Sequence, residues 1–366
     1  MTVSWESIAN EHILGIAPYE PGKPIEELER EFGLTDVIKL ASNENPLGPS
    51  PGVVAAITLA VGELTRYPDG SGYDLKAALA ARYRVGAEQI VLGNGSNDIL
   101  ELVAHAFLRP GKSAVLAQHS FAVYTLATHA FGAAGIEVPA RDFGHDLAAM
   151  RAAIRPDTSV VWLANPNNPT GTWLPPDAIK EFIASVPENV LVVLDEAYNE
   201  YLPPEQQADT ASWLAGFPHL ILSRTFSKAY GLAGLRIGYG LMHADAAAML
   251  NRVRQPFNVN ALAQAAAIAA LQDTDYVSQC CALNRQGMQQ LEGGFRRLAL
   301  HFIPSHGNFI CVRVGDAARV NLALLRRGVI VRPVGNYGMP EFLRVTVGTA
   351  TENERFLEAL AAALAE

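Results

Sequence analysis

The chain has 366 residues, of which 49% are hydrophobic and 18% charged, a balance typical of a globular protein with enough apolar side chains for a core. A chain of this length is expected to form roughly two domains. Its formal net charge of −9 argues against a nucleic-acid-binding surface, because such surfaces carry clustered basic residues.

Three cysteines, Cys280, Cys281 and Cys311, make an odd number and lack the spacing of metal ligands, so no metal site is expected. Adjacent Cys280 and Cys281 are predicted to be buried apolar residues rather than disulfide partners, which indicates a cytoplasmic protein. The first ten residues lack the positively charged region and the apolar region that a signal peptide contains, so no signal peptide is expected. Apolar runs are too short to span a membrane.

The N-terminal third combines turns with short helices and strands. Proline residues at 18, 21 and 24 exclude a continuous helix there. The hydrophobic pattern then predicts helices at 25–32, 53–64, 75–83 and 99–107, and strands at 37–40 and 89–92.

From residue 113 onward, short apolar strands alternate with helices. Strands are predicted at 113–117, 158–163, 190–194 and 220–222, and helices at 147–154 and 176–185. This alternation indicates a mostly parallel sheet covered by helices on both faces. A long alanine-rich helical segment at about 246–297 is predicted to lead into a smaller α+β lobe, with strands at 309–314, 329–332 and 342–347.

Polar residues follow four of these strands, at the points where the strands end. In open α/β sheets, ligands bind beyond the carboxyl ends of the strands. The turn after 89–92 is glycine-rich, so its free backbone N–H groups, with Ser96 and Asn97 as helix caps, could hold a phosphate. An ordinary capped turn is the alternative, because the turn matches neither a P-loop nor a dinucleotide fingerprint.

Two further strand ends carry polar side chains in confined surroundings. Asn168 lies in the loop 165–171, where two X-Pro bonds limit the freedom of the chain. Asp195 ends an apolar run and should be buried, so it needs a cation or hydrogen-bond donors. For Asn168 the alternative is a rigid connector without a binding role. For Asp195 the alternative is a structural salt bridge or a helix cap.

The fourth strand leads into Ser-Arg-Thr-Phe-Ser-Lys228 and then Gly-Leu-Ala-Gly-Leu-Arg236. Small and uncharged surroundings, together with the nearby cation, would lower the pKa of Lys228 and let its amine attack an aldehyde. Hydroxyls and Arg236 would suit the phosphate of a cofactor that carries this aldehyde. The alternative is a surface lysine and a solvated arginine after a core strand.

This motif resembles the lysine loop of fold-type-I pyridoxal-phosphate aminotransferases, and more narrowly of the histidinol-phosphate aminotransferase group. The resemblance extends from Leu-Ala-Ser-Asn-Glu-Asn-Pro at 40–46 to Leu-Arg-Val-Thr-Val-Gly-Thr at 343–349. It implies a large α/β domain with a mostly parallel sheet covered on both faces, plus a smaller α+β lobe built from both termini. The expected segments are 1–45 (small lobe), 46–255 (large cofactor-binding domain) and 256–366 (linking helix and C-terminal small domain).

The resemblance also implies a role for each residue of a pyridoxal 5'-phosphate site. Lys228 is similar to the Schiff-base lysine, which also moves the proton, and Asp195 to the partner of the pyridine nitrogen. Asn168 and Tyr198 resemble the pair that bonds the ring 3-oxygen. The cofactor phosphate would be held by Gly95, Ser96, Asn97, Thr225, Ser227 and Arg236, together with Tyr67 from the neighbouring subunit of a homodimer.

Two positions depart from the pattern of the family. Phe121 stands where relatives often carry a tyrosine stacked on the cofactor ring, and it retains the stacking area without the hydroxyl. Asn97 stands where many relatives have aspartate. Both departures are expected to affect rate or pH optimum rather than the type of reaction.

For the substrate, the resemblance assigns Tyr19, Asn43, Arg332 and Arg344. Arg344 lies in an apolar strand and should face an anion, since an unpaired buried charge is costly. The implied reaction converts L-histidinol phosphate and 2-oxoglutarate to imidazole acetol phosphate and L-glutamate, in histidine biosynthesis. Alternatives are an aromatic amino-acid aminotransferase, a phosphothreonine-type decarboxylase and a non-catalytic regulatory protein that binds pyridoxal phosphate.

Overall fold

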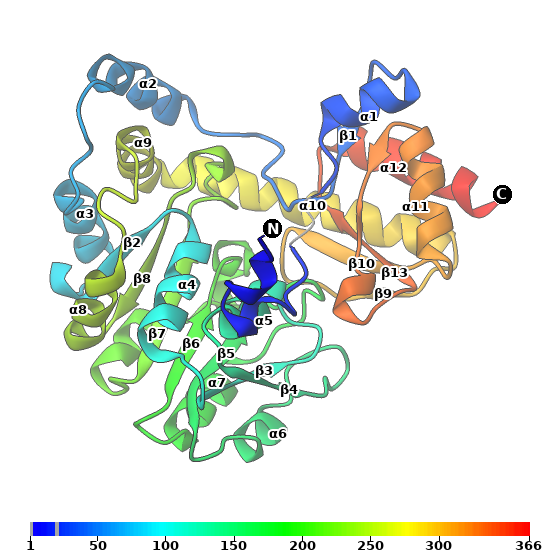
Figure 1. Ribbon diagram of the computed structural model, residues 1–366. Coiled ribbons are helices and arrows are strands. Elements are labelled where there is room, and N and C mark those ends of the chain that lie inside the picture. The colour runs from blue at the N-terminus through cyan, green and yellow to red at the C-terminus, as the bar shows by residue number, and fades with distance from the viewer. Residues whose placement is uncertain (1–2, 19–21) are drawn as a thin grey trace.

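The computed structural model describes residues 3–18 and 22–366, and its main feature is a seven-stranded sheet (Figure 1). Its strand order is β2 (Ile90–Gly93), β8 (Gly238–Met242), β7 (Leu220–Thr225), β6 (Leu191–Asp195), β5 (Thr158–Ala164), β3 (Ser113–Ala117) and β4 (Ala134–Val138). Strand β8 pairs antiparallel with both of its neighbours, whereas β7, β6, β5, β3 and β4 pair in parallel. The sheet is therefore mostly parallel, as the sequence predicts.

Helices cover both faces of this sheet because successive strand residues point to opposite sides. Val192 and Leu194 pack in the cluster on one face, and Val193 packs in the cluster on the other. The first face is covered by α3 (Tyr73–Tyr83), α6 (Leu147–Ala152), α7 (Pro176–Ser185) and α9 (Ala261–Gln272), with α2 (Pro51–Ala60) packed on α9. The second is covered by α4 (Ser96–Phe107), α5 (Ala122–Ala130) and α8 (Ala244–Val253).

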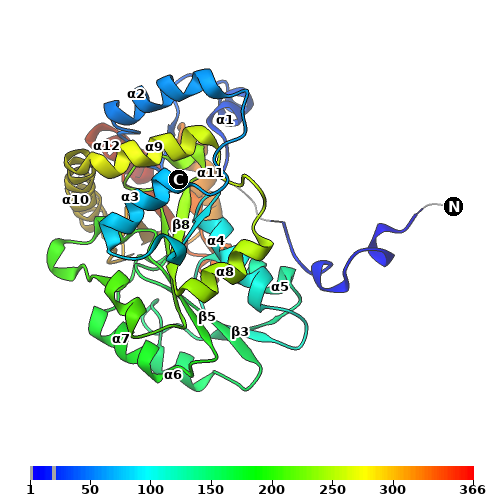
Figure 2. The same cartoon turned by 90° about the vertical axis from the view of Figure 1, so that its left-hand side faces the viewer.

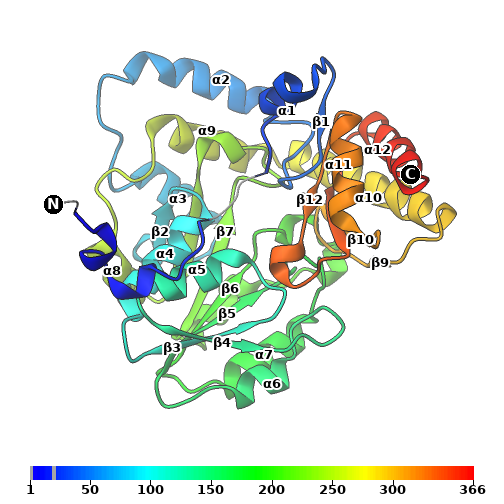
Figure 3. The same ribbon diagram turned by 45° about the vertical axis from the view of Figure 1, so that its right-hand side comes forward.

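A smaller lobe forms around an antiparallel sheet of β12 (Arg332–Pro333), β13 (Phe342–Thr346), β10 (Phe309–Arg313) and β9 (Phe302–Ile303). Helices α10 (Thr274–Arg297), α11 (Ala317–Arg326) and α12 (Ala350–Leu364) pack against it (Figure 3). Both ends of the chain contribute, since β1 (Ile38–Lys39) pairs in parallel with β11 (Val329–Ile330), and α1 (Ile25–Phe32) lies beside them. Residues 3–18, by contrast, extend past α5 and away from the rest of the chain (Figure 2).

Most predicted elements are confirmed, but several are corrected. The predicted helical segment 246–297 is three helices, because Pro256 interrupts it and the side chains of Asn260 and Asp273 cap α9 and α10. The sequence reading missed β4, whose edge position leaves its residues partly exposed and without an apolar pattern. It also missed α5 and β8. In the described residues no helix is long and apolar enough to cross a membrane.

The adjacent cysteines of α10 behave as predicted. Cys280 and Cys281 are both buried and free, and so is Cys311 in β10. Burial raises the pKa of the Cys281 thiol to about 12, so it stays protonated at neutral pH. These side chains are therefore apolar packing groups.

A buried ion pair lies behind the carboxyl ends of β6 and β7. Arg224 Nε donates a hydrogen bond to Glu196 Oε2 at 2.9 Å, and both side chains are less than 8% exposed. The Thr210 hydroxyl donates to the same carboxylate, and the Tyr83 hydroxyl accepts from the guanidinium. Glu196 directly follows β6 and Arg224 belongs to β7, so the pair ties the two strand ends together.

We expect Glu196→Gln to lower the free energy of unfolding by about 3–5 kcal/mol, because it leaves the Arg224 charge buried without a counter-charge. Arg313→Ala is the control, since the Arg313–Glu341 pair is about half exposed on both sides. Losing an exposed pair should cost about 0–1 kcal/mol. Chemical denaturation of both variants measures the difference, and equal losses would mean that the buried pair contributes no more than a surface one.

Candidate active site

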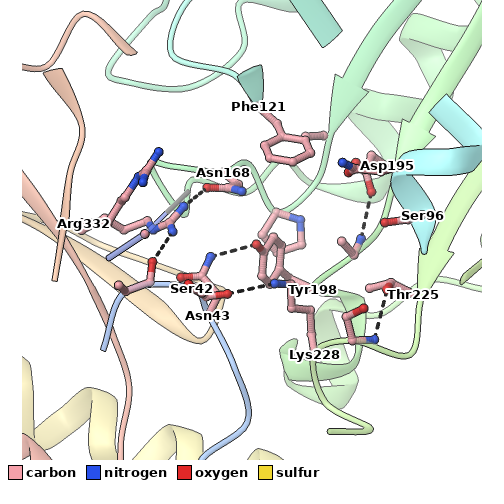
Figure 4. A pocket seen from close by; sticks show the side chains of 18 of the residues that line it. Ser42, Asn43, Ser96, Phe121, Asn168, Asp195, Tyr198, Thr225, Lys228 and Arg332 are labelled. Carbon is pink, nitrogen blue, oxygen red and sulfur yellow. Dashed lines mark hydrogen bonds between the residues drawn. The ribbon is translucent and has the colours of Figure 1, made fainter. Parts of the chain in front are cut away.

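A pocket with about 860 Å³ of empty space, including solvent at its mouth, lies beyond the carboxyl ends of β5, β6 and β7, between the sheet and the small lobe (Figure 4). Thirteen of the residues predicted for the site line it: Asn43, Ser96, Asn97, Phe121, Asn168, Asp195, Tyr198, Thr225, Ser227, Lys228, Arg236, Arg332 and Arg344. Gly95, also predicted for the site, lies against the guanidinium of Arg236. Residues far apart in the sequence are therefore brought together as the strand-end argument predicts.

Lys228 projects into this pocket from the loop after β7. Its Nζ donates a hydrogen bond to the backbone oxygen of Ser42 at 3.1 Å. Burial and the positive charge of Arg344 lower the pKa of Lys228 from 10.5 to about 8. About a tenth of the amine is thus neutral at pH 7, far more than for an ordinary lysine, and the neutral form is the nucleophile.

Asp195 ends β6 at the floor of the pocket, and both of its carboxylate oxygens accept hydrogen bonds. The Tyr124 hydroxyl donates to Oδ2 at 2.8 Å, and the Ala197 amide donates to Oδ1 at 3.2 Å. Burial nevertheless raises the pKa of Asp195 to about 6. The sequence reading missed Tyr124; the available signal was a tyrosine on an apolar helix, since a buried tyrosine hydroxyl usually needs a partner.

Asn43 connects the N-terminal segment to both lobes. Its Nδ2 donates to the Tyr198 hydroxyl at 2.9 Å, and its backbone N–H donates to the Thr346 hydroxyl at 2.9 Å. Its φ of 56° lies in the left-handed region, a conformation that asparagine adopts more readily than most residues. Burial raises the pKa of Tyr198 to about 12, so its hydroxyl keeps its proton at neutral pH.

Arg344 crosses from β13 to the loop of Asn168. Its guanidinium donates to Asn168 Oδ1 and to the backbone oxygen of Ala41, and both acceptors are uncharged. Its Nε is buried and has no partner among residues 3–18 and 22–366. Within that same part of the chain no carboxylate forms a salt bridge with Arg344, so its charge is available to an anion entering the pocket.

The opposite end of the pocket is formed by the N-terminus of α4. Here the prediction that Ser96 and Asn97 cap the helix is wrong, because α4 begins at Ser96 and no side chain of the described residues caps it. Gly95 precedes the helix with a φ of 85°, and a Cβ atom there would lie 2.4 Å from Arg236 Nη2. Only glycine allows the guanidinium to approach so closely.

These groups fit the phosphate of a cofactor. The helix N-terminus supplies backbone N–H groups and positive potential. Hydroxyls of Ser96, Thr225 and Ser227 and the guanidinium of Arg236 line the same end of the pocket. Arg236 has a φ of 58°, in the left-handed region that non-glycine residues adopt only occasionally.

Among the predicted residues that the structure describes, Tyr67 lies away from the pocket lining. Tyr67 is 82% exposed and stacks on Phe257, with ring centroids 4.8 Å apart. Its predicted contact with the phosphate of a neighbouring subunit stays a prediction. Tyr19 lies outside the described residues.

Comparison with known proteins shows which family has this arrangement. Residues 35–360 match the family model described as aminotransferase class I and II. The histidinol-phosphate aminotransferase 1 of Thiobacillus denitrificans is 64% identical over 97% of this chain and 93% of its own length. The histidinol-phosphate aminotransferase 2 of Ralstonia nicotianae is 58% identical over 97% of both chains.

The chain belongs to the class I and II aminotransferases. The crystal structure of histidinol-phosphate aminotransferase from Sinorhizobium meliloti, in complex with pyridoxal-5'-phosphate, superimposes on this aminotransferase with a TM-score of 0.91. The two chains are 30% identical, and the match covers 98% of each. The family resemblance predicted from the Lys228 loop and the predicted fold class are both confirmed.

We expect Lys228 of the cofactor-free aminotransferase to react with acetic anhydride with a midpoint near pH 8, since only the neutral amine is nucleophilic and its pKa is about 8. Lys23 serves as the internal control, because its hydrogen bond to Glu31 raises its pKa above 10.5. Competitive labelling across pH, read by mass spectrometry, measures both residues in one sample. A midpoint for Lys228 at the ordinary lysine value would refute the effect of burial and Arg344.

Proposed function

We propose that this aminotransferase moves the amino group of L-histidinol phosphate to 2-oxoglutarate, giving imidazole acetol phosphate and L-glutamate, in histidine biosynthesis. The observation that carries the proposal is the presence of two arginines, Arg332 and Arg344, in the pocket that contains Lys228. Two guanidinium groups suit a phosphate monoester, which carries nearly two negative charges. The relatives named above are histidinol-phosphate aminotransferases.

The cofactor is pyridoxal 5'-phosphate, and the residues of the pocket suit each part of it. Arg236, the hydroxyls beside it and the α4 N-terminus would hold the phosphate, and Phe121 would stack on the ring. Asn168 and Tyr198 would bond the ring 3-oxygen, and Asp195 the pyridine nitrogen. When bound, the cofactor supplies an electron sink for carbanion chemistry.

Lys228 has two tasks in this proposal. Its Nζ would hold the cofactor covalently at its aldehyde group, with loss of water, and the neutral amine is needed for this. When free of the cofactor, the same Nζ would act as the base that accepts the proton from the substrate carbon and gives it back. A pKa of about 8 allows both tasks, because the amine gains and loses a proton easily near neutral pH.

Substrate contacts are proposed on the small-lobe side of the pocket. Arg344 binds the α-carboxylate of glutamate, or the phosphate where histidinol phosphate takes its place. Arg332 is proposed as a second phosphate contact, and Asn43 and Tyr19 as further contacts. Asn43 lines the pocket and is held by hydrogen bonds to Tyr198 and Thr346, which supports this assignment.

We further propose a cytoplasmic homodimer with shared active sites. Large apolar side chains are exposed near α2 and α3, including Leu59 (83%) and Tyr73 (73%), and Tyr67 lies between these two helices in sequence. Exposed apolar side chains in one region are typical of a protein–protein interface. Tyr67 would then reach the cofactor phosphate of the partner.

We also propose that the chain divides into three segments: 1–45 in the small lobe, 46–255 as the large cofactor-binding domain, and 256–366 as the linking helix and C-terminal small domain.

A donor panel tests the proposed function. Purified enzyme is given histidinol phosphate, phenylalanine, tyrosine or histidine, with 2-oxoglutarate as acceptor. We expect kcat/KM to be highest for histidinol phosphate and turnover to vanish in Lys228→Ala, which lacks the primary amine. A higher value for phenylalanine or tyrosine would instead identify an aromatic amino-acid aminotransferase.

We expect Arg332→Ala to lower kcat/KM for histidinol phosphate by about 10- to 100-fold, because one hydrogen bond to a charged group contributes about 1.5–3 kcal/mol. The loss with glutamate should be clearly smaller, since Arg344 alone meets its single α-carboxylate. Steady-state kinetics with each donor measures both effects. Arg313→Ala, remote from the pocket on the same lobe, is the control, and equal losses for both donors would make Arg332 a structural residue.

A further inference from the structure

Tyr124 is rigidly held beneath Asp195. It lies in α5, is only 1% exposed, and stacks on Trp162 with ring centroids 5.5 Å apart and planes 5° apart. The indole of Trp162 donates a hydrogen bond to the Thr128 hydroxyl, which donates to the backbone oxygen of Tyr124. The phenol therefore has little freedom, and its hydroxyl points at Asp195 Oδ2 from 2.8 Å.

We propose that Tyr124 is a positioning residue that orients the Asp195 carboxylate and keeps the shared proton on the pyridine nitrogen of the cofactor. The inference rests on the proposed cofactor site. Tyr124 is among the residues that line the pocket, and the function assigned to its hydroxyl is exerted through Asp195.

Orientation follows from the two donors that hold the carboxylate. Ala197 fixes Oδ1 and Tyr124 fixes Oδ2, so the carboxylate cannot rotate without losing a hydrogen bond. Without the tyrosine hydroxyl, a single backbone donor would remain. The Asp195 carboxylate could then adopt several orientations when the cofactor binds, and only some of them would direct an oxygen at the ring nitrogen.

The position of the proton follows from the charges around Asp195. Burial and the negative charge of Glu196 favour the protonated acid, whereas Lys228 and the hydrogen bonds from Tyr124 and Ala197 favour the carboxylate. Tyr198 also faces this group. Burial and Asp195 raise the pKa of Tyr124 well above 10, so its hydroxyl remains a donor throughout the working range and never competes as a base.

The proton has two possible locations between Asp195 and the ring nitrogen. It either stays on the carboxyl group, leaving a neutral pyridine, or moves to nitrogen, leaving a carboxylate and a pyridinium. A donor that bonds the carboxylate favours the second state. Tyr124 thus strengthens the binding of a protonated ring, and the same bond supports the electron-withdrawing form of the cofactor.

The test uses Tyr124→Phe, which retains the ring that stacks on Trp162. We expect the dissociation constant of pyridoxal phosphate, measured by fluorescence titration of the cofactor-free enzyme, to rise on the order of 10-fold. In an Asp195→Ala background the same change should have almost no effect, because no side-chain acceptor remains for the Tyr124 hydroxyl. Tyr239→Phe removes another buried hydroxyl, one bonded to Tyr83, and should leave the dissociation constant unchanged.

A purely structural role would give a different pattern. Tyr124→Phe would then weaken cofactor binding equally in both backgrounds, or not at all, and either result overturns the inference. Titrations run well below the melting temperature of each cofactor-free variant separate binding from folding. If the wild-type enzyme itself failed to bind pyridoxal phosphate, the proposed function would fail rather than the assignment of Tyr124 alone.

Discussion

The parallel pairing of β6 with β7 is the constraint on which the site depends. In this register Asp195 lies beside Ser223, so the residues that follow both strands emerge together at one edge of the sheet. Asp195 faces the pocket, while its neighbour Glu196 is paired behind the sheet with Arg224. A shift by one residue would exchange these faces and place Glu196 in the pocket. The buried ion pair therefore fixes the geometry of the site as well as the strands.

Burial in the same pocket shifts the pKa values of Asp195 and Lys228 in opposite directions. Burial disfavours charge on both Asp195 and Lys228, raising the pKa of the first and lowering that of the second. Asp195 retains hydrogen-bond donors that compensate in part, whereas the neighbouring Arg344 adds to the effect on Lys228. The pocket thus holds an amine that readily loses its proton and a carboxyl group whose charge depends on what binds beside it.

Much of this arrangement could be predicted from the sequence, because the strand ends carry the candidate site residues and strands have a strong apolar signal. Asn168 and Lys228 follow such strands, Asp195 is the last residue of one, and all three line the pocket. Tyr124 could not be found in this way, since its partner is 71 residues away and only packing aligns them. The prediction that Ser96 and Asn97 cap α4 was wrong, because a turn motif does not specify which residue begins the helix.

The bond between Asn43 and Thr346 joins residues 303 positions apart and has a consequence for protein synthesis. During translation, segment 38–43 leaves the ribosome long before β11 and β13 exist to receive it. The large sheet can form meanwhile, since its strands all lie between residues 90 and 242. The pocket, however, has no small-lobe wall until the last strand is made. A nascent or prematurely terminated chain therefore contains the lysine loop without the burial and without Arg344, which together lower the pKa of Lys228 in the folded protein.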